Sequence, residues 1–219
     1  MIYQTSHLMD YLPKRYQANT EQEQNRQAVY SFKDGYCPLR IKDKLCDKIN
    51  EVAVGDKSNW IVLFIPASTS YKTKLRYESL AKQLQERTNV TATISAIQNN
   101  VDCEAKHLSG NQKDPQQVYN FNSSIFRGKK VILIDDVTTT GHSFQCCANI
   151  LSALGASSVY GLFVAKTINP HWNRGCGSYH GVLYDGEPAD LYDETDLEPA
   201  ELYDDCDPDY DCEEYEPYY

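Results

Sequence analysis

The chain lacks several features that mark common classes of protein. No stretch of its 219 residues is long and apolar enough to span a membrane or to act as a signal peptide. The Gly-x-Gly-x-x-Gly fingerprint of dinucleotide-binding domains is absent, and the eight cysteines include no Cys-x-x-Cys pair. Scattered cysteines of this kind are typical of reduced thiols that pack as small hydrophobic side chains, so we expect a cytoplasmic protein. The length of the chain predicts one core domain with additions.

Basic residues are missing from the end of the chain. Residues 185–219 contain 16 Asp and Glu and no Lys or Arg, whereas residues 1–184 contain 21 basic and 15 acidic residues. The formal net charge of −10 therefore combines a mildly basic part, as suits a protein that binds a polyanion, with an acidic tail. A segment so acidic and so poor in aliphatic residues is expected to be disordered or loosely docked.

The most informative segment covers residues 131–143, Val-Ile-Leu-Ile-Asp-Asp-Val-Thr-Thr-Thr-Gly-His-Ser. Its four apolar residues predict a strand buried on both faces of a parallel sheet. Asp135 and Asp136 follow at the carboxyl end, where open α/β sheets bind ligands. The Thr-rich turn ends at Gly141 before a helical pattern, and free N–H groups there suit a phosphate. Two carboxylates can accept hydrogen bonds from vicinal hydroxyls, so the segment predicts a ribose 5-phosphate site.

A helix and another strand are predicted after this segment. From Phe144 to Leu154 the apolar residues recur at i, i+3, i+4 and i+7, and Gly155 suits the position after a helix. Residues 158–165 then indicate a strand, which completes a βαβ unit. An ordinary βαβ crossover is the alternative, although its turn seldom places two acids before three Thr and a Gly.

The run Val131 to Gly141 resembles the phosphoribosyl pyrophosphate (PRPP) binding signature of the type I phosphoribosyltransferases. The resemblance implies an α/β fold with a central, mostly parallel sheet flanked by helices and a flexible hood loop. It also implies that Asp135 and Asp136 hold the ribose hydroxyls. The residues it assigns to the 5′-phosphate are Val137, Thr138, Thr139, Thr140, Gly141, His142 and Ser143.

A second strand, loop and helix lie upstream. Residues 60–65 form another apolar run, Pro66-Ala-Ser-Thr-Ser70 follows at once, and a helical face comes next. The apolar residues of that face are Tyr77, Leu80, Ala81 and Leu84. In the family the equivalent loop binds pyrophosphate through main-chain N–H groups, which implies this role for Ala67, Ser68 and Thr69.

Cations follow this loop. Lys72, Lys74 and Arg76 could neutralise phosphate oxygens, and a solvated helix face is the alternative for each. The order of Ile-Pro, a spacer, Arg76 and a Leu-Ala pair resembles the competence protein F branch of the family. That resemblance is partial, because the chain lacks the Cys-x-x-Cys module and has Arg-Tyr then Glu-Ser where the branch has Arg-Gly then Asn-Gln.

Residues 90–97 indicate a further strand, and a polar connection without clear period runs from Gln98 to Lys130. A connection this long inside a compact domain is typical of a lid or a binding loop. In the family the insertion here is the hood that closes over PRPP. Lys106, His107 and Lys113 could then reach the pyrophosphate, with solvated loop charges as the alternative.

The predicted organisation has three parts. Residues 1–55 are expected to form an N-terminal helical cap, with helices around Thr20 to Phe32 and Leu39 to Val52. Residues 56–184 are expected to form the phosphoribosyltransferase core, and residues 185–219 the acidic tail.

The resemblance implies an enzyme that binds PRPP with Mg²⁺ and transfers the phosphoribosyl group to a nucleophile, a nucleobase or related amine, with release of pyrophosphate. Magnesium would be held mainly through PRPP, so we predict no metal site made by the protein alone. Thr139 stands where hypoxanthine-guanine enzymes have an Asp base, which disfavours a 6-oxopurine acceptor.

The alternative function is a PRPP-responsive regulatory or partner protein that keeps the fold without turnover. No basic stripe with interleaved aromatic residues suggests a nucleic acid partner, and no membrane partner is expected. The sequence leaves the acceptor and the oligomeric state open, with a homodimer among the alternatives.

Overall fold

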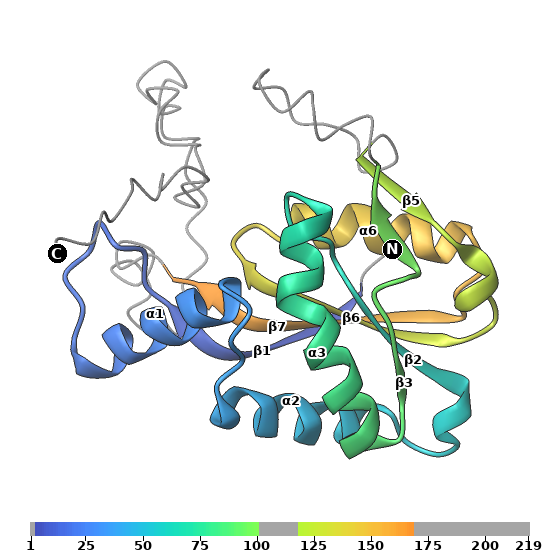
Figure 1. The fold of residues 1–219 in the computed structure, drawn as a ribbon, viewed down its shortest axis with the longest axis horizontal. Helices are drawn as coiled ribbons and strands as arrows, with labels where there is room; N and C mark the ends of the chain where they lie inside the picture. Colours follow the sequence, from blue (N-terminus) through green and yellow to red (C-terminus); the bar gives the residue numbers. More distant parts are fainter. Residues whose placement is uncertain (1–2, 101–117, 169–219) are drawn as a thin grey trace, which may run out of the picture.

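The structure is a computed structural model that describes residues 3–100 and 118–168. These residues form a five-stranded sheet in the order β1-β7-β6-β2-β3, and every neighbouring pair in it is parallel. Helices cover both faces of this sheet (Figure 1). The predicted α/β class with a parallel sheet flanked by helices is confirmed. Among the described residues, no helix has the length and apolar character needed to cross a membrane.

The elements of the sheet and its helices have clear bounds. The strands are β1 (Gln4–Tyr11), β2 (Trp60–Phe64), β3 (Thr91–Ala92), β6 (Lys130–Thr138) and β7 (Ser158–Thr167). The helices are α1 (Thr20–Lys33), α2 (Leu39–Val52), α3 (Ser70–Thr88) and α6 (His142–Ala153). A separate antiparallel ribbon pairs β4 (Ile97–Asn99) with β5 (Tyr119–Phe121), and short 3₁₀ turns cover Lys57–Asn59 and Ser123–Ile125.

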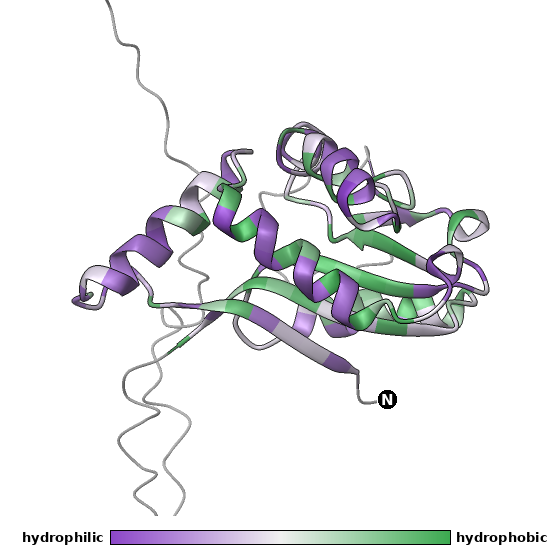
Figure 2. Cartoon of the chain, turned by 90° about the horizontal axis from the view of Figure 1, so that it is seen from below, coloured by the Kyte–Doolittle hydropathy of each residue, from purple (hydrophilic) through white to green (hydrophobic). Residues whose placement is uncertain are grey.

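Alternation along the central strands divides the core into two layers. On one face, α1, α2 and α3 pack against the side chains at even positions of β2 and β6, such as Phe64 and Ile134. On the other face, α6 and the β4-β5 ribbon pack against odd positions such as Leu63 and Leu133. Residues 60–64 of β2 and 131–134 of β6 are accordingly all buried, and Figure 2 shows the central strands largely hydrophobic while hydrophilic and hydrophobic residues alternate along the helices. The four predicted helices are therefore confirmed, each with buried apolar residues on its inner face, while Leu39 of α2 and Tyr71 and Leu75 of α3 are exposed.

Strand β1 was missed by the sequence analysis. The expected helical cap over residues 1–55 is wrong for residues 4–11, which pair with β7 at the edge of the core sheet. The reason is physical: an edge strand packs on one side only, and the segment Gln-Thr-Ser-His-Leu-Met-Asp-Tyr is mostly exposed or half-buried. It therefore lacks the continuous apolar run that marked β2 and β6.

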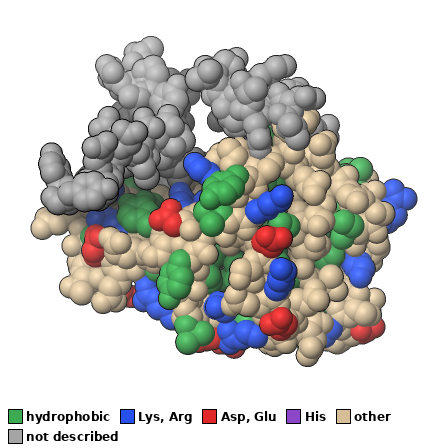
Figure 3. All heavy atoms as spheres, viewed as in Figure 1, with side chains coloured by type: hydrophobic (Ala, Val, Ile, Leu, Met, Phe, Trp, Pro, Cys, Tyr) green, Lys and Arg blue, Asp and Glu red, His purple; other side chains and the backbone are tan. Residues whose placement is uncertain are grey.

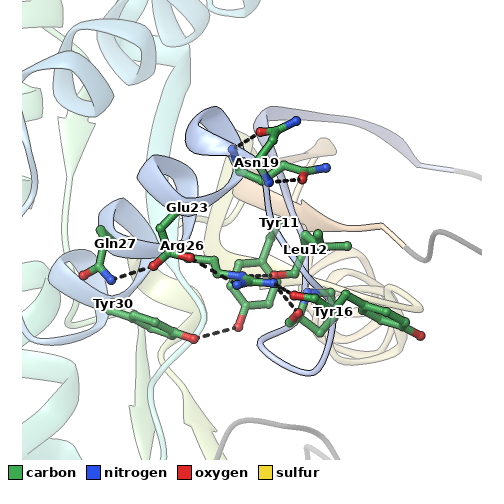
Figure 4. Close-up of polar contacts among 10 residues, drawn as sticks. Tyr11, Leu12, Tyr16, Asn19, Glu23, Arg26, Gln27 and Tyr30 are labelled. Atoms are coloured by element: carbon green, nitrogen blue, oxygen red, sulfur yellow. Dashed lines mark hydrogen bonds and ion pairs between the residues drawn. The ribbon is translucent and has the colours of Figure 1, made fainter.

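The connection from β1 to α1 is held by one buried arginine. Arg26 is 6% exposed and donates to three carbonyl oxygens of this connection, those of Leu12 at 2.6 Å, Pro13 at 2.7 Å and Tyr16 at 2.5 Å. Glu23, one turn earlier on α1, accepts a further bond from the guanidinium. Figure 4 shows the guanidinium enclosed by these groups. The guanidinium thus supplies donors to Leu12 O and Tyr16 O and a second donor to Pro13 O, which also accepts from the Tyr16 N–H group.

Two further expectations need correction. The strand predicted over residues 90–97 is split, because Thr93 Oγ1 accepts from the Ser95 N–H group in a turn between β3 and β4. The connection from Gln98 to Lys130 is not structureless at its ends, where β4, β5 and a 3₁₀ turn form. Lys106, His107 and Lys113, and the acidic tail at residues 185–219, lie outside the described residues.

Gly161 of β7 gives a test of the packing between the sheet and α6. A Cβ atom at this position would lie 2.7 Å from Phe144 Cε2 and 2.9 Å from Thr5 Cγ2. We expect Gly161→Ala to lower the free energy of unfolding by about 1 to 3 kcal/mol through overpacking, as measured by urea denaturation. In a Phe144→Leu background, which lacks the contacting ring atoms, the cost should be clearly smaller. An equal cost in both backgrounds would contradict this account.

Candidate active site

The two acids of the signature lie at the carboxyl end of β6, where its pairing with β7 continues to Thr138. Because successive side chains in a strand point to opposite faces, the two carboxylates do not share a face. Asp136 faces α3, where it meets Arg76. Asp135 lies on the side of β5 and α6, and its charge adds to the burial that raises the pKa of Tyr119 and of Cys147. Both acids are half-buried.

The environment of Asp135 favours its neutral form. Burial raises the pKa of this carboxyl well above its usual range, and the negative charge of Asp136 raises it further. The Asp136 N–H group donates to Asp135 Oδ1 at 2.8 Å and offsets part of this effect. The site therefore stores unfavourable electrostatic energy whenever both acids are ionised, and a cationic or hydroxyl-rich ligand would relieve it.

Asp136 is already engaged by the protein. Its Oδ2 atom forms an ion pair with Arg76 Nη1 at 2.5 Å, and its Oδ1 atom accepts from the Val137 N–H group at 2.6 Å. The side chains of Arg76 and Asp136 are 10% and 14% exposed. Arg76 was expected from the sequence to face phosphate oxygens, and the structure places it against the acid instead. Lys72 and Lys74 are exposed on the same helix.

The predicted phosphate loop follows β6 directly. Gly141 adopts a left-handed conformation with φ of 77° and begins α6, and no side chain caps this helix. The His142 N–H group donates to Thr140 Oγ1 at 3.4 Å, and the N–H groups of Ser143 and Phe144 in the first turn are available to an anion. The loop lines a cavity of about 820 Å³. Of the seven residues predicted to bind the phosphate, five line it: Thr138, Thr139, Thr140, Gly141 and His142.

Strands β1 and β7 form the other wall of this cavity, and the sequence analysis did not assign any of their residues to the site. Thr5, His7 and Lys166 line the cavity, and Thr167 Oγ1 lies 2.9 Å from Thr139 Oγ1. Lys166 directly follows the predicted strand 158–165, so the sequence could have predicted its position at the carboxyl edge of the sheet. His7 carried no such signal, because its strand was not recognised.

The predicted pyrophosphate loop follows β2. Its carbonyl groups are held from behind by the ribbon: Asn99 Nδ2 donates to Ala67 O at 2.7 Å and Tyr119 Oη donates to Pro66 O at 3.3 Å. Thr69 caps α3 by accepting from the Lys72 N–H group. Asn99 and Tyr119 were missed from the sequence, because they support the loop from a ribbon that was not predicted.

The two loops lie side by side because β2 and β6 are neighbours in the sheet and run in the same direction. The Ile65 N–H group, at the start of the first loop, donates to Ile134 O, just before the acid pair. On the face shown in Figure 3, Lys and Arg side chains are scattered among acidic and hydrophobic ones. The described residues on this face therefore form no broad basic surface.

The raised pKa of Asp135 predicts how stability depends on pH. The native state keeps the proton of this carboxyl above the pH at which the unfolded chain loses it, so the free energy of unfolding should fall as pH rises from about 4 toward the native pKa. Asp135→Asn removes this titration. We expect the stability of the variant relative to the original chain to increase as pH rises above about 4, measured by urea denaturation over a series of pH values.

Asp47 on α2 is exposed and provides the control. Asp47→Asn should leave the pH profile of stability unchanged. A stability difference between Asp135→Asn and the original chain that stays constant over this pH range would refute the assignment.

No family model matches the chain, and a search of curated proteins gives no match. Among solved structures, a hypoxanthine phosphoribosyltransferase from Staphylococcus aureus is similar with 13% identity and a TM-score of 0.39, over 65% of this chain and 76% of that one. An adenine phosphoribosyltransferase from Saccharomyces cerevisiae has 21% identity and a TM-score of 0.37, over 59% and 70% of the two chains. The chain spans 25% of a third structure, an allosteric regulatory enzyme of purine biosynthesis, with 16% identity and a TM-score of 0.38.

Proposed function

We propose that the protein is a phosphoribosyltransferase that binds PRPP and transfers its phosphoribosyl group to a nucleophile with release of pyrophosphate. One observation carries the proposal: an uncapped helix N-terminus, an acid pair and a second polar loop follow the carboxyl ends of two neighbouring parallel strands, β2 and β6. PRPP presents a phosphate, a diol and a pyrophosphate along one sugar ring. The three features at the sheet edge match these three groups.

The 5′-phosphate is assigned to the loop before α6. Its backbone N–H groups and the hydroxyls of Thr138 and Thr140 supply donors, and the positive end of the helix dipole adds to the attraction. The left-handed Gly141 leaves the loop open, since a Cβ atom there would have only Thr138 Oγ1 within 4 Å, at 3.7 Å. A phosphate can therefore approach the backbone closely.

The pyrophosphate is assigned to residues 67–69. Ala67 is buried and Ser68 is exposed, so the loop turns outward at this point. Asn99 and Tyr119 donate to the carbonyl groups of Ala67 and Pro66, so these hydrogen bonds hold the start of the loop before the ligand arrives. When donors are positioned in advance, little free energy is spent on reorienting them as the leaving group gains negative charge.

In the proposed reaction, the bond from C1 of the ribose to pyrophosphate breaks and its electron pair leaves with pyrophosphate. A bond from C1 to the nucleophile forms, and the nucleophile then loses a proton to solvent. Positive charge builds on the ribose in between, and the Asp136 carboxylate stabilises it while both acids accept hydrogen bonds from the hydroxyls. The protein contributes position and charge rather than a covalent bond.

Magnesium fits the donor atoms of this site, since it prefers carboxylate and phosphate oxygens and retains several waters. We propose that PRPP supplies most of its ligands and that Asp135 and Asp136 hold its waters. When bound, the ion would neutralise charge on pyrophosphate. For the acceptor, Thr139 places a hydroxyl bonded to Thr167 in the middle of the loop, and no carboxylate base. This favours an acceptor other than a 6-oxopurine.

The test is release of pyrophosphate from PRPP with magnesium across a panel of nucleobases and amines. We expect turnover with at least one acceptor, and a loss of at least about 100-fold in kcat/KM in Asp136→Asn, because a charged group at the reacting centre is removed. Asp47→Asn, an exposed change on α2, should retain full activity.

Calorimetry of PRPP binding completes this test. Tight binding without turnover for any acceptor would favour the alternative, a PRPP-responsive regulatory or partner protein. Absence of PRPP binding would overturn both functions.

A further inference from the structure

We propose that Arg76 is a positioning residue that orients Asp136 toward the ribose, and that it does not bind the pyrophosphate. The inference rests on the proposed function, because it assigns a role within the same site. It departs from the expectation drawn from the sequence, which placed Arg76 among the cations that neutralise phosphate oxygens.

The contacts of Arg76 hold its guanidinium in place. Nη1 forms the 2.5 Å ion pair with Asp136 Oδ2, and Nε donates to Lys33 O at 3.3 Å. The guanidinium carbon also lies 5.7 Å from the centre of the Tyr77 ring. Tyr77 is itself fully buried and stacks on Phe64 at 4.7 Å between centroids. Turning Arg76 toward the pyrophosphate loop would break these contacts together.

Burial makes this ion pair costly to break. The side chain of Arg76 is 10% exposed and that of Asp136 is 14% exposed, so water would replace few of the lost interactions. Within the described part of the chain, no other cation forms an ion pair with Asp135 or Asp136. Removal of Arg76 would leave two adjacent carboxylates without a compensating charge.

The other titratable groups near the acids do not compensate for their charge. Tyr77 on α3, Tyr119 on β5 and Cys147 on α6 each have a pKa raised above the usual value, mainly because burial disfavours their charged forms. All three are therefore neutral at neutral pH. Arg76 acts against the effects that raise the pKa of the Asp135 carboxyl, so its charge serves the whole acid pair.

The pair also connects to the phosphate loop. While Oδ2 of Asp136 is held by Arg76, Oδ1 accepts from the Val137 N–H group at 2.6 Å, at the point where the loop begins. Each carboxylate oxygen retains a second lone pair that can accept from a ribose hydroxyl. Arg76 thus orients the Asp136 carboxylate. The oriented carboxylate in turn positions the ribose hydroxyls that bind to it and the Val137 N–H group that donates to it.

The experiment compares two probes that divide the substrate, ribose 5-phosphate and magnesium pyrophosphate, by calorimetry on the full chain. We expect Arg76→Gln to weaken ribose 5-phosphate binding by about tenfold or more, because a charge-assisted contact that orients Asp136 is lost. Magnesium pyrophosphate should bind within about twofold of the original chain. Arg76→Lys keeps the positive charge but loses the planar guanidinium. Its affinity for ribose 5-phosphate should lie between those of the original chain and Arg76→Gln.

Two further readouts separate positioning from a merely structural role. The pH midpoint for ribose 5-phosphate binding should move upward in Arg76→Gln, because the charge that lowers the pKa of Asp135 is then lost and this carboxyl holds its proton to higher pH. In an Asp136→Asn background, Arg76→Gln should have little further effect on ribose 5-phosphate affinity. Lys82→Gln removes one positive charge from an exposed site on the same helix and should change neither quantity.

Equal losses for both probes in Arg76→Gln, with an unchanged pH midpoint, would overturn the inference and restore a pyrophosphate-binding role. If the original chain binds neither probe nor PRPP, the proposed function fails. The melting temperatures of the two single variants and the double variant then test the pair alone. Additive losses would overturn the coupling of Arg76 to Asp136, and losses well short of additive would uphold it.

Discussion

The candidate site depends on the parallel pairing of β6 with β2 on one side and β7 on the other. Val131 to Ile134 of β6 are all buried, with side chains packed on both faces of the sheet. The same residues pair with β2 along one edge of the strand and with β7 along the other. Because all three strands run in one direction, their carboxyl ends meet at the same edge. The acids, the phosphate loop and the loop after Ile65 are neighbours for this reason alone. A shift of β6 by one residue would exchange the faces of both acids.

This placement has an electrostatic cost. The strand carries two adjacent carboxyl groups into a half-buried position, where burial and mutual repulsion raise the pKa of Asp135. A core designed for stability alone would avoid such a pair. The chain reduces the cost with one buried guanidinium from α3 and with the N–H groups of Asp136 and Val137. Negative charge that the protein compensates only in part is typical of a site whose ligand supplies the remaining interactions.

The parts of the structure that the sequence predicted are those specified by nearby residues. The buried run of β6, the apolar faces of α3 and α6 and the left-handed glycines at positions 141 and 155 all follow from local periodicity or from one backbone requirement. Strand β1 was missed because an edge strand with polar residues has no continuous apolar run. The partner of Arg76 was missed because 60 residues separate it from Asp136, and no spacing rule connects an α3 residue to the end of β6.

The candidate site likewise contains residues that can be predicted from the local sequence and residues that the fold brings in from distant segments. The segment from Val131 to Ser143 contains an acid pair, a hydroxyl-rich loop and a helix start, so the proposed sugar phosphate site can be predicted from thirteen consecutive residues. The other groups of the candidate site come from elsewhere: Arg76 of α3 pairs with Asp136, Asn99 and Tyr119 of the ribbon hold the loop after β2, and Lys166 of β7 lines the cavity. Local sequence can specify which atoms would meet a phosphate, because every residue type except proline has a backbone N–H group. The charge state and direction of a carboxylate depend instead on distant partners brought close by the fold, and the Arg76 and Asp136 pair is where that dependence is most direct.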